Sequence, residues 1–216
     1  MGSRFQARQA RIATATMYTK LKRFADIALS APLCLALSPA MGAIALGIKL
    51  EDGGPAVFRQ ERLGLGGRVF TMFKFRTMSV GAERKMELNA DGSVKTVADD
   101  MRITRVGRFL RKTSLDELPQ LLNVLRGDMS VIGPRPDLPL HAEYYNERHR
   151  RKLEVRPGIT GLAQVSGRNE LPWERRLELD VEYVENLSLA LDVSIFFRTF
   201  TTVLSRRAVY ASGSAS

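Results

Sequence analysis

The sequence predicts a mainly α-helical protein with one small β-hairpin, organised as a single domain attached to a membrane helix. Three observations lead to this expectation. An uncharged apolar run lies near the N-terminus, two segments of alternating character flank a glycine-rich turn, and helical periodicity dominates the remainder. With 216 residues the chain can bury an ordinary core, and no Pro/Gly/Ser-rich linker divides it.

The apolar run covers residues 27–48, which are 22 residues without a charge. As a helix it would measure about 33 Å, enough to cross a bilayer core. Basic residues lie on both sides, with Lys20, Lys22 and Arg23 before it and Lys49 after it. We therefore expect a polar leader over residues 1–16 and a membrane-associated helix over residues 17–50.

Two prolines interrupt this run, and Ser38 immediately precedes the second, Pro39. A proline removes a backbone donor, and a serine hydroxyl can supply a local partner for the freed group. A bend at Ser38-Pro39 would return the helix to the same membrane face. Because prolines also occur in spanning helices, the residues alone leave re-entry and spanning equally open.

The next segments form the predicted hairpin, with strands over residues 57–62 and 69–76 around the glycine-rich turn at 64–67. A short helix is expected from Ser79 to residue 88, followed by a polar loop over 89–100. The periodicity then predicts five helices, over residues 105–112, 116–126, 138–153, 173–186 and 189–206. The domain would therefore occupy residues 51–206 and leave a flexible tail at 207–216.

Composition narrows the classes of partner. The net charge of +10 favours an anionic partner, which nucleic acid, anionic lipid and nucleotide phosphates all satisfy. With one Trp and little aromatic material among the basic residues, a base-stacking surface is poorly supported, and we expect no nucleic-acid partner. The single cysteine, Cys34, cannot form a disulfide within the chain, which favours a reducing setting.

The segment most informative about chemistry is RFLRKTSLDELPQ, residues 108–120. One interpretation is structural, because Ser114 and Glu117 fit a capping box. Pro119 would then fall inside the helix, where a backbone donor is needed. A helix that starts at Asp116 avoids the conflict and places Asp116 among free N–H groups, a place suited to phosphate.

A carboxylate that attacks a diphosphate needs a metal ion and cationic donors, because the reacting groups repel each other. Glu117 can hold Mg²⁺, while Arg111 and Arg135 can meet phosphate oxygens. Pro134 and Pro136 stiffen the chain around Arg135 and reduce the entropy lost when its guanidinium is fixed. From this chemistry alone, the functional and structural interpretations of the acidic pair remain equally open.

Four ordered motifs then indicate a family. They are FKFRTM (residues 73–78), RxxSLDELPQ (111–120), NVLRGDMSVIGPRP (123–136) and RPGITGLAQVSGRN (156–169). Together with the Ser-Pro pair, this set resembles the bacterial monotopic phosphoglycosyl transferases, also called bacterial sugar transferases, from about residue 20 to 206. Four motifs in order are far more specific than any one alone.

The resemblance implies that Ser38-Pro39 breaks a re-entrant helix, and that Asp116 and Glu117 form a catalytic dyad on the cytoplasmic face of the bacterial inner membrane. In such enzymes the aspartate attacks the β-phosphorus of a UDP-sugar and UMP leaves. Undecaprenyl (polyprenyl) phosphate then accepts the sugar-phosphate from the covalent intermediate, which implies ping-pong kinetics. The family's larger members carry extra spanning helices before this unit, so the minimal form is expected here.

The resemblance also implies roles for individual residues. Glu117 would bind Mg²⁺, and Lys20, Lys22 and Arg23 would meet the lipid head group. The residues expected to bind the substrate are Lys74, Arg76, Arg111, Pro134, Arg135 and Pro136.

His141 and His149 have no acidic or Cys partners at ligand spacing and are expected to be surface residues.

A rival interpretation makes the chain a non-catalytic basic membrane adaptor that binds anionic lipids or a protein partner. In that case replacing Asp116 would change stability by about 1 kcal/mol and no activity. The sequence names neither the sugar nor the glycoconjugate pathway, whether exopolysaccharide, capsule, O-antigen or glycoprotein. It is compatible with a homodimer without fixing the oligomeric state.

Overall fold

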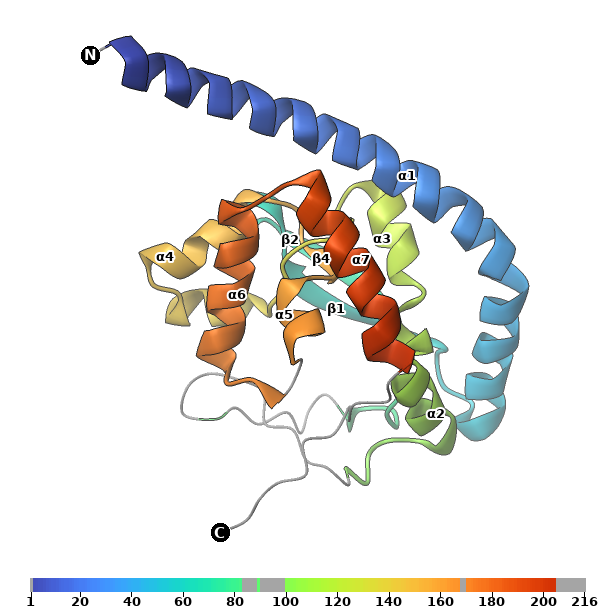
Figure 1. Ribbon diagram of the computed structural model, residues 1–216. Coiled ribbons are helices and arrows are strands. Elements are labelled where there is room, and N and C mark those ends of the chain that lie inside the picture. Colours follow the sequence, from blue (N-terminus) through green and yellow to red (C-terminus); the bar gives the residue numbers. More distant parts are fainter. Residues whose placement is uncertain (1, 83–88, 90–99, 168–169, 205–216) are drawn as a thin grey trace.

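A computed structural model describes residues 2–82, 89, 100–167 and 170–204. Its longest element is helix α1 (Gly2–Asp52), which extends beyond the rest of the chain and curves around one side of it (Figure 1). The remaining helices and strands form a mainly helical body inside this curve. The expected class, mainly α with a small β component and one long apolar helix, is confirmed.

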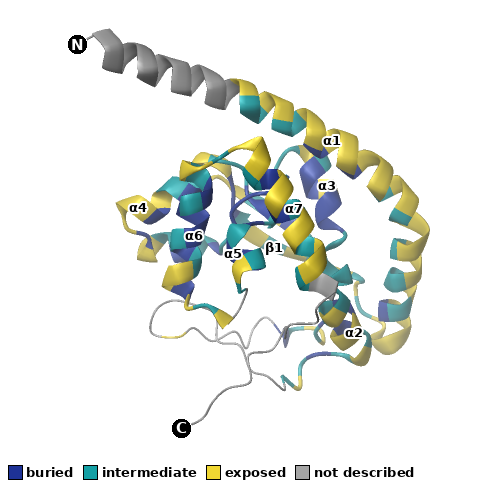
Figure 2. Ribbon diagram, viewed as in Figure 1, coloured by how far each residue is buried: buried dark blue, intermediate teal, exposed yellow. Residues whose placement is uncertain are grey.

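Within α1, the segment from Met17 to Asp52 is long and apolar enough to cross a membrane, and its most apolar 18-residue window has a mean hydropathy of 1.8. Only 6% of its most apolar window is buried against the protein. Large apolar side chains such as Leu35, 77% exposed, therefore face outward, as Figure 2 shows by the yellow colour of much of α1. An uncovered apolar surface of this size is typical of a lipid-facing helix.

The predicted break at Ser38-Pro39 is absent, because α1 stays helical through both residues. Pro39 deprives the carbonyl of Leu35 of its usual backbone donor, four residues later in the chain. Ser38 Oγ takes over this role and donates to Leu35 O at 2.8 Å. The expected bend is present only as curvature of a continuous helix (Figure 1), and re-entry itself stays a prediction.

The hairpin is confirmed. Strands β1 (Val57–Leu63) and β2 (Val69–Phe75) pair antiparallel, with Val57 opposite Phe75 and Leu63 opposite Val69. The turn includes the 3₁₀ segment η1 (Leu65–Gly67), in which φ is 66° at Gly66 and 77° at Gly67. Glycine is favoured at these positive φ values, so the glycines shape the turn.

Helix α2 (Arg105–Thr113) agrees with the predicted 105–112, and Thr104 Oγ1 caps it by accepting from Gly107 N at 2.9 Å. The expected helix over 116–126 is instead divided. A 3₁₀ turn η3 (Leu115–Glu117) precedes helix α3 (Gln120–Arg126), which starts directly after Pro119. Proline fits a helix start because it has no N–H to leave unsatisfied.

The expected helix over 138–153 is also divided, into η4 (Pro139–Tyr144), α4 (Glu147–Arg150) and η5 (Arg151–Glu154). Helices α6 (Trp173–Glu185) and α7 (Leu189–Leu204) agree with prediction. The sequence did not predict the parallel pair of β3 (Ser130–Ile132) with β4 (Gly158–Thr160), or helix α5 (Leu162–Ser166). Most of the expected helix over 79–88 and loop over 89–100 lies outside the described residues.

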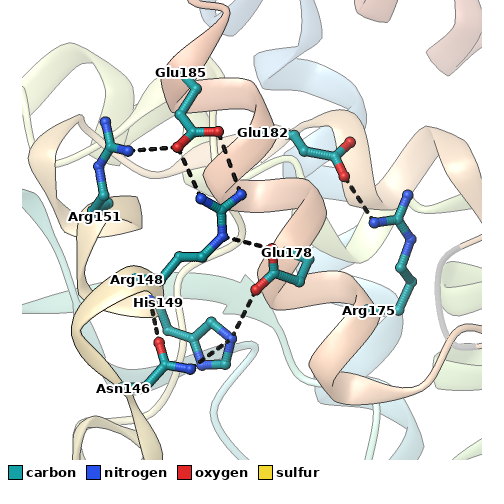
Figure 3. A network of polar contacts seen from close by, with 8 residues as sticks. All are labelled: Asn146, Arg148, His149, Arg151, Arg175, Glu178, Glu182 and Glu185. Carbon is teal, nitrogen blue, oxygen red and sulfur yellow. Dashed lines mark hydrogen bonds and ion pairs between the residues drawn. The ribbon is translucent and has the colours of Figure 1, made fainter.

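A polar network fastens α4 and η5 to α6 (Figure 3). Arg148 donates to Glu178 at 2.9 Å and to Glu185 at 3.0 Å, and Arg151 also reaches Glu185. His149 Nε2 lies 3.3 Å from Glu178 Oε1 and its residue is buried. The expectation that His149 is a surface residue is therefore wrong, because packing against α6 covers it.

Partly buried polar contacts attach α1 to the body of the chain. The carboxylate of Asp192 on α7 accepts from Tyr18 at 2.6 Å, from Lys22 at 2.5 Å and from Tyr183 at 2.7 Å. Arg23 donates to the carbonyls of α3 at residues 124 and 125. Lys22 and Arg23 thus serve as internal ties, and of the three predicted lipid contacts Lys20 alone has an exposed side chain.

We expect Asp192→Asn to destabilise the protein by about 2–4 kcal/mol, because it leaves the partly buried Lys22 ammonium without its counter-charge. The midpoint of thermal unfolding in detergent measures the effect. Glu174→Gln, at an exposed position on α6, is the matched control and should leave the midpoint unchanged. Equal midpoints for both variants would show that Asp192 does not hold α1 in place.

Candidate active site

The acidic pair lies where the chain passes from α2 to α3. Ser114 ends α2 in the left-handed region, with φ 58°, and turns the chain into η3. Its side chain makes no capping hydrogen bond to η3, so the capping-box interpretation is wrong. Asp116 and Glu117 therefore lie in a tight turn that packs against strand β2.

Cations from two other segments reach Glu117. Lys74 Nζ, on β2, donates to Glu117 Oε1 at 3.0 Å, and Arg135 Nη1 lies 3.6 Å from the same oxygen. The side chain of Lys74 is 17% exposed and that of Glu117 22%, whereas Arg135 is 43% exposed. The structure thus brings together three predicted site residues from distant parts of the sequence.

Asp116 has a different environment from its neighbour. Within the described part of the chain its carboxylate makes no hydrogen bond or ion pair. Burial raises the pKa of Asp116, and the adjacent charge of Glu117 raises it further, while Lys74, Arg111 and Arg135 oppose the rise. A partly buried carboxylate beside three cations and without a fixed partner can act as a nucleophile.

One of these cations, Arg111, is held in place by a side chain outside the acidic pair. Arg111 Nε donates to Thr77 Oγ1 at 2.8 Å, which orients the guanidinium of Arg111. Burial lowers the pKa of Lys74, although the charge of Glu117 acts in the opposite direction. Sequence reasoning did not single out Thr77, although it lies within FKFRTM.

Arg76, predicted among the substrate-binding residues, is paired with groups outside the acidic pair. Its guanidinium forms a bidentate pair with Asp52, and its Nε donates to Pro55 O at 2.6 Å. The residue is only 6% exposed. Arg76 therefore ties the end of β2 to the end of α1. Its partner follows the apolar run in sequence, and no local pattern predicted the pair.

The segment before Arg135 packs backbone against backbone. A Cβ added to Gly133 would come within 2.5 Å of Arg156 O, so this position requires glycine. Pro134 is fully buried, and its carbonyl accepts from Gly158 N at 2.8 Å. The carbonyl of Pro136 accepts from Arg62 Nη1 at 3.1 Å. Both prolines thus support Arg135 through their backbone positions.

His141, expected on the surface, is 4% exposed and is therefore also a correction. Its ring lies 5.0 Å from that of Trp173, and its Nδ1 lies 3.7 Å from Asp137 Oδ1. The expectation was wrong because the short 3₁₀ segment η4 turns this side chain inward. His141 therefore packs in the core between Trp173 and Asp137.

The donors at the acidic pair suit Mg²⁺. This ion usually takes one or two protein carboxylates together with substrate phosphates and water. Two adjacent carboxylates are present, and the described residues hold no cluster of three or more His, Cys, Asp or Glu that could enclose a metal alone. The residues therefore fit an ion that arrives with a phosphorylated substrate.

A cleft of about 410 Å³ opens between α1 and the body of the chain. Its lining is mainly apolar and includes two arginines, and the residues are Met41, Gly42, Val57, Arg59, Phe73, Phe75, Pro119, Leu122 and Arg126. The guanidinium of Arg126 lies over the ring of Phe73, 4.8 Å from its centre. Pro119 joins this cleft to the acidic pair, two residues earlier in the chain.

Comparison with known proteins gives a consistent result. The family model described as bacterial sugar transferase matches residues 17–206. An uncharacterized sugar transferase of Bacillus subtilis is 48% identical over 157 residues, which are 73% of this chain and 74% of the relative. The UDP-glucose:undecaprenyl-phosphate glucose-1-phosphate transferase of Caulobacter vibrioides is 44% identical over 198 residues, covering 88% of this chain and 72% of the relative.

Other relatives are longer. The undecaprenyl-phosphate galactose phosphotransferase of Salmonella typhimurium is 43% identical over 200 residues. These are 88% of this chain but 42% of that protein. The chain thus spans less than half the length of several of the curated relatives it matches.

Proposed function

The chain belongs to the bacterial sugar transferase family, and on that premise we propose that it transfers a sugar 1-phosphate from a UDP-sugar to undecaprenyl phosphate. Relatives that carry this kind of name support the choice of substrates. The observation that carries the proposal is the site itself. Asp116 lies without a fixed partner beside Glu117, which Lys74 and Arg135 contact from two other segments.

In the proposed first step, a carboxylate oxygen of Asp116 attacks the β-phosphorus of the UDP-sugar. A bond from that oxygen to phosphorus forms, the bond from the β-phosphorus to the bridging oxygen breaks, and UMP leaves with the bridging oxygen. The cations Lys74, Arg111 and Arg135 stabilise the charge on the transferring phosphoryl group. Bound Mg²⁺, held by Glu117, would neutralise part of the diphosphate charge.

In the second step, a phosphate oxygen of the lipid attacks the same phosphorus. The bond to Asp116 breaks and the carboxylate is regenerated, which leaves a polyprenyl diphosphate sugar. Asp116 is the nucleophile of the first half-reaction and the leaving group of the second, so the two substrates react in turn. This order gives ping-pong kinetics.

The acceptor is a lipid, and the apolar surface supports this part of the proposal. Helix α1 exposes its apolar side chains, and the mainly apolar cleft opens beside it. A polyprenyl chain suits such a lining. In this account the helix lies in the bacterial inner membrane, re-entering the cytoplasmic face, and the catalytic domain receives UDP-sugar from the cytoplasm.

The pH dependence of the first step follows from the charges around Asp116. The nucleophile must be ionised, and Lys74 is the largest of the influences that hold the pKa of Asp116 down. Lys74→Met should therefore raise that pKa and shift the acidic limb of kcat/KM to higher pH. Rates of UMP release between pH 5 and pH 9 measure the shift. An unmoved acidic limb would show that Asp116 is not the titrating nucleophile.

The proposal is tested with detergent-purified protein, Mg²⁺, undecaprenyl phosphate and a panel of UDP-sugars. UMP release from at least one sugar supports the reaction and identifies the donor. Release of UDP would indicate glycosyl transfer instead. Absence of any nucleotide product from folded protein, across a broad panel, would favour the non-catalytic adaptor.

A further inference from the structure

A cluster of three ionisable groups, two of them buried and one mostly buried, lies outside the reacting pair. Lys152 Nζ, on η5, is 2.6 Å from Asp137 Oδ2 and 2.7 Å from Asp180 Oδ2. The side chains of Lys152 and Asp180 are each 3% exposed, and that of Asp137 is 13% exposed. Buried charges are costly unless they are paired, and this arrangement gives one ammonium to two carboxylates. A core built for stability alone would more simply use apolar residues.

The cluster lies directly against the segment that carries Arg135. Asp180 Oδ1 accepts from Arg135 N at 3.4 Å, so the lysine and the arginine backbone share one carboxylate. Asp137 follows two residues after Arg135 and also accepts from Tyr145 Oη at 2.6 Å. Lys152 is therefore paired with Asp180, which accepts from the Arg135 backbone, and with Asp137, which ends the segment.

The backbone on either side of Arg135 is fixed as well. Gly133 N donates to Thr160 O at 2.9 Å, and the carbonyl of Asp137 accepts from Leu63 N at 2.9 Å. Together with the contacts of Pro134 and Pro136, these bonds hold the chain at each end of a short segment. Its exposed part is the guanidinium that reaches Glu117. Such an arrangement is typical of a supporting layer that aims one reactive cation.

The electrostatic balance of the cluster depends on the lysine. Burial raises the pKa of Asp180, and the charge of Lys152 opposes the rise. Burial alone would raise the pKa of Asp137. The charge of Lys152, together with hydrogen bonds from His141, Lys152 and Tyr145, instead holds this pKa well below its usual range. Without the ammonium, two carboxylates would face each other in the core. The segment on which both act would then shift.

We infer that Lys152, held between Asp137 and Asp180, is a positioning residue that aims Arg135 at the phosphate groups of the nucleotide sugar. The inference rests on the proposed function for its substrate. Lys152 does not touch the reacting atoms, and its effect passes through the backbone of Arg135. This role distinguishes it from Lys74, which contacts Glu117 directly.

A double-mutant cycle separates positioning from simple stabilisation. We expect Arg135→Ala to lower kcat/KM for UMP release by about 100-fold, through loss of one phosphate donor. Lys152→Met should lower it by about tenfold, because the donor is misplaced. In the Arg135→Ala background, Lys152→Met should cause no further loss, since the group that it aims is absent.

The matched control is the neighbouring cation of the same 3₁₀ segment. Arg151 pairs on the surface with Glu185 and Glu154, so Arg151→Met should leave kcat/KM near the native value in both backgrounds. Should Lys152→Met fail to fold, Asp180→Asn keeps the volume and weakens the same contacts. Asp180→Asn should give a smaller loss that again vanishes in the Arg135→Ala background.

Two outcomes would overturn the inference. Equal fold losses from Lys152→Met in both backgrounds would show a structural role alone, and an unchanged rate for Arg135→Ala would remove the residue that Lys152 is said to aim. The same cycle measured by calorimetry, with UDP as the probe, needs no turnover. Non-additive UDP binding without any UMP release would uphold the inference while overturning the proposed reaction.

Discussion

Asp116→Asn is expected to abolish UMP release from the UDP-sugar, with a loss of about 10⁴-fold or more. The amide has nearly the same shape as the carboxylate but lacks its nucleophilic oxygen, so no covalent intermediate can form. Because Asp116 makes no hydrogen bond or ion pair in the described structure, the fold should be unaffected. The rate of UMP release and the midpoint of thermal unfolding are measured on the same preparation.

The control for this variant is Asp128→Asn, at a carboxylate that accepts from Asn123 Nδ2 at 3.4 Å. It should retain nearly native activity. The adaptor hypothesis makes the opposite prediction for Asp116→Asn, namely a stability change of about 1 kcal/mol and no catalytic effect. Native rates of UMP release from the Asp116→Asn protein would show that Asp116 is not the nucleophile, whereas the adaptor hypothesis predicts no UMP release from either protein.

Glu117→Gln should have the second largest effect, a loss of about 10²- to 10³-fold in UMP release and a higher Mg²⁺ concentration for half-maximal rate. The substitution removes the proposed metal ligand and the charge that both Lys74 and Arg135 contact. The rate is measured over a Mg²⁺ titration. Glu61→Gln, at an exposed position on β1, is the matched control.

A Mg²⁺ dependence unchanged by Glu117→Gln would contradict the assignment of Glu117 as the metal ligand.

Removing Glu117 also removes the neighbouring charge that raises the pKa of Asp116. The residual activity of Glu117→Gln should therefore persist to lower pH than native activity. This direction is opposite to the shift expected for Lys74→Met, so the two variants together test the electrostatics of the pair.

Local patterns predicted those parts of the structure that local forces determine. The hairpin follows from alternation and glycines, and α6 and α7 follow from long apolar periodicity. The resemblance carried by the ordered motifs assigned Glu117 and Arg135 to one site, which periodicity alone could not do because it does not bring distant segments together. The strands β3 and β4 have three residues each, too few for alternation to be recognised.

The residues whose roles were missed depend on tertiary contacts. Lys22 and Arg23 look like membrane-flanking cations in sequence, but Asp192 and α3 take them as partners. Arg76 is taken by Asp52, and no local signal identified Lys152 as buried. Pro39 does remove a backbone donor, as expected from the sequence. The hydroxyl of Ser38 replaces that donor, and the helix stays continuous.

The central claim is the covalent intermediate on Asp116, and the most direct test is intact-mass measurement of the purified protein with UDP-sugar and Mg²⁺ but no lipid. The account predicts a mass gain of one sugar-phosphate, lost in Asp116→Asn, with about one equivalent of UMP released per active chain. Adding undecaprenyl phosphate should then return the mass to its original value. UMP that appears only after the lipid is added, with no change in protein mass, would contradict the account.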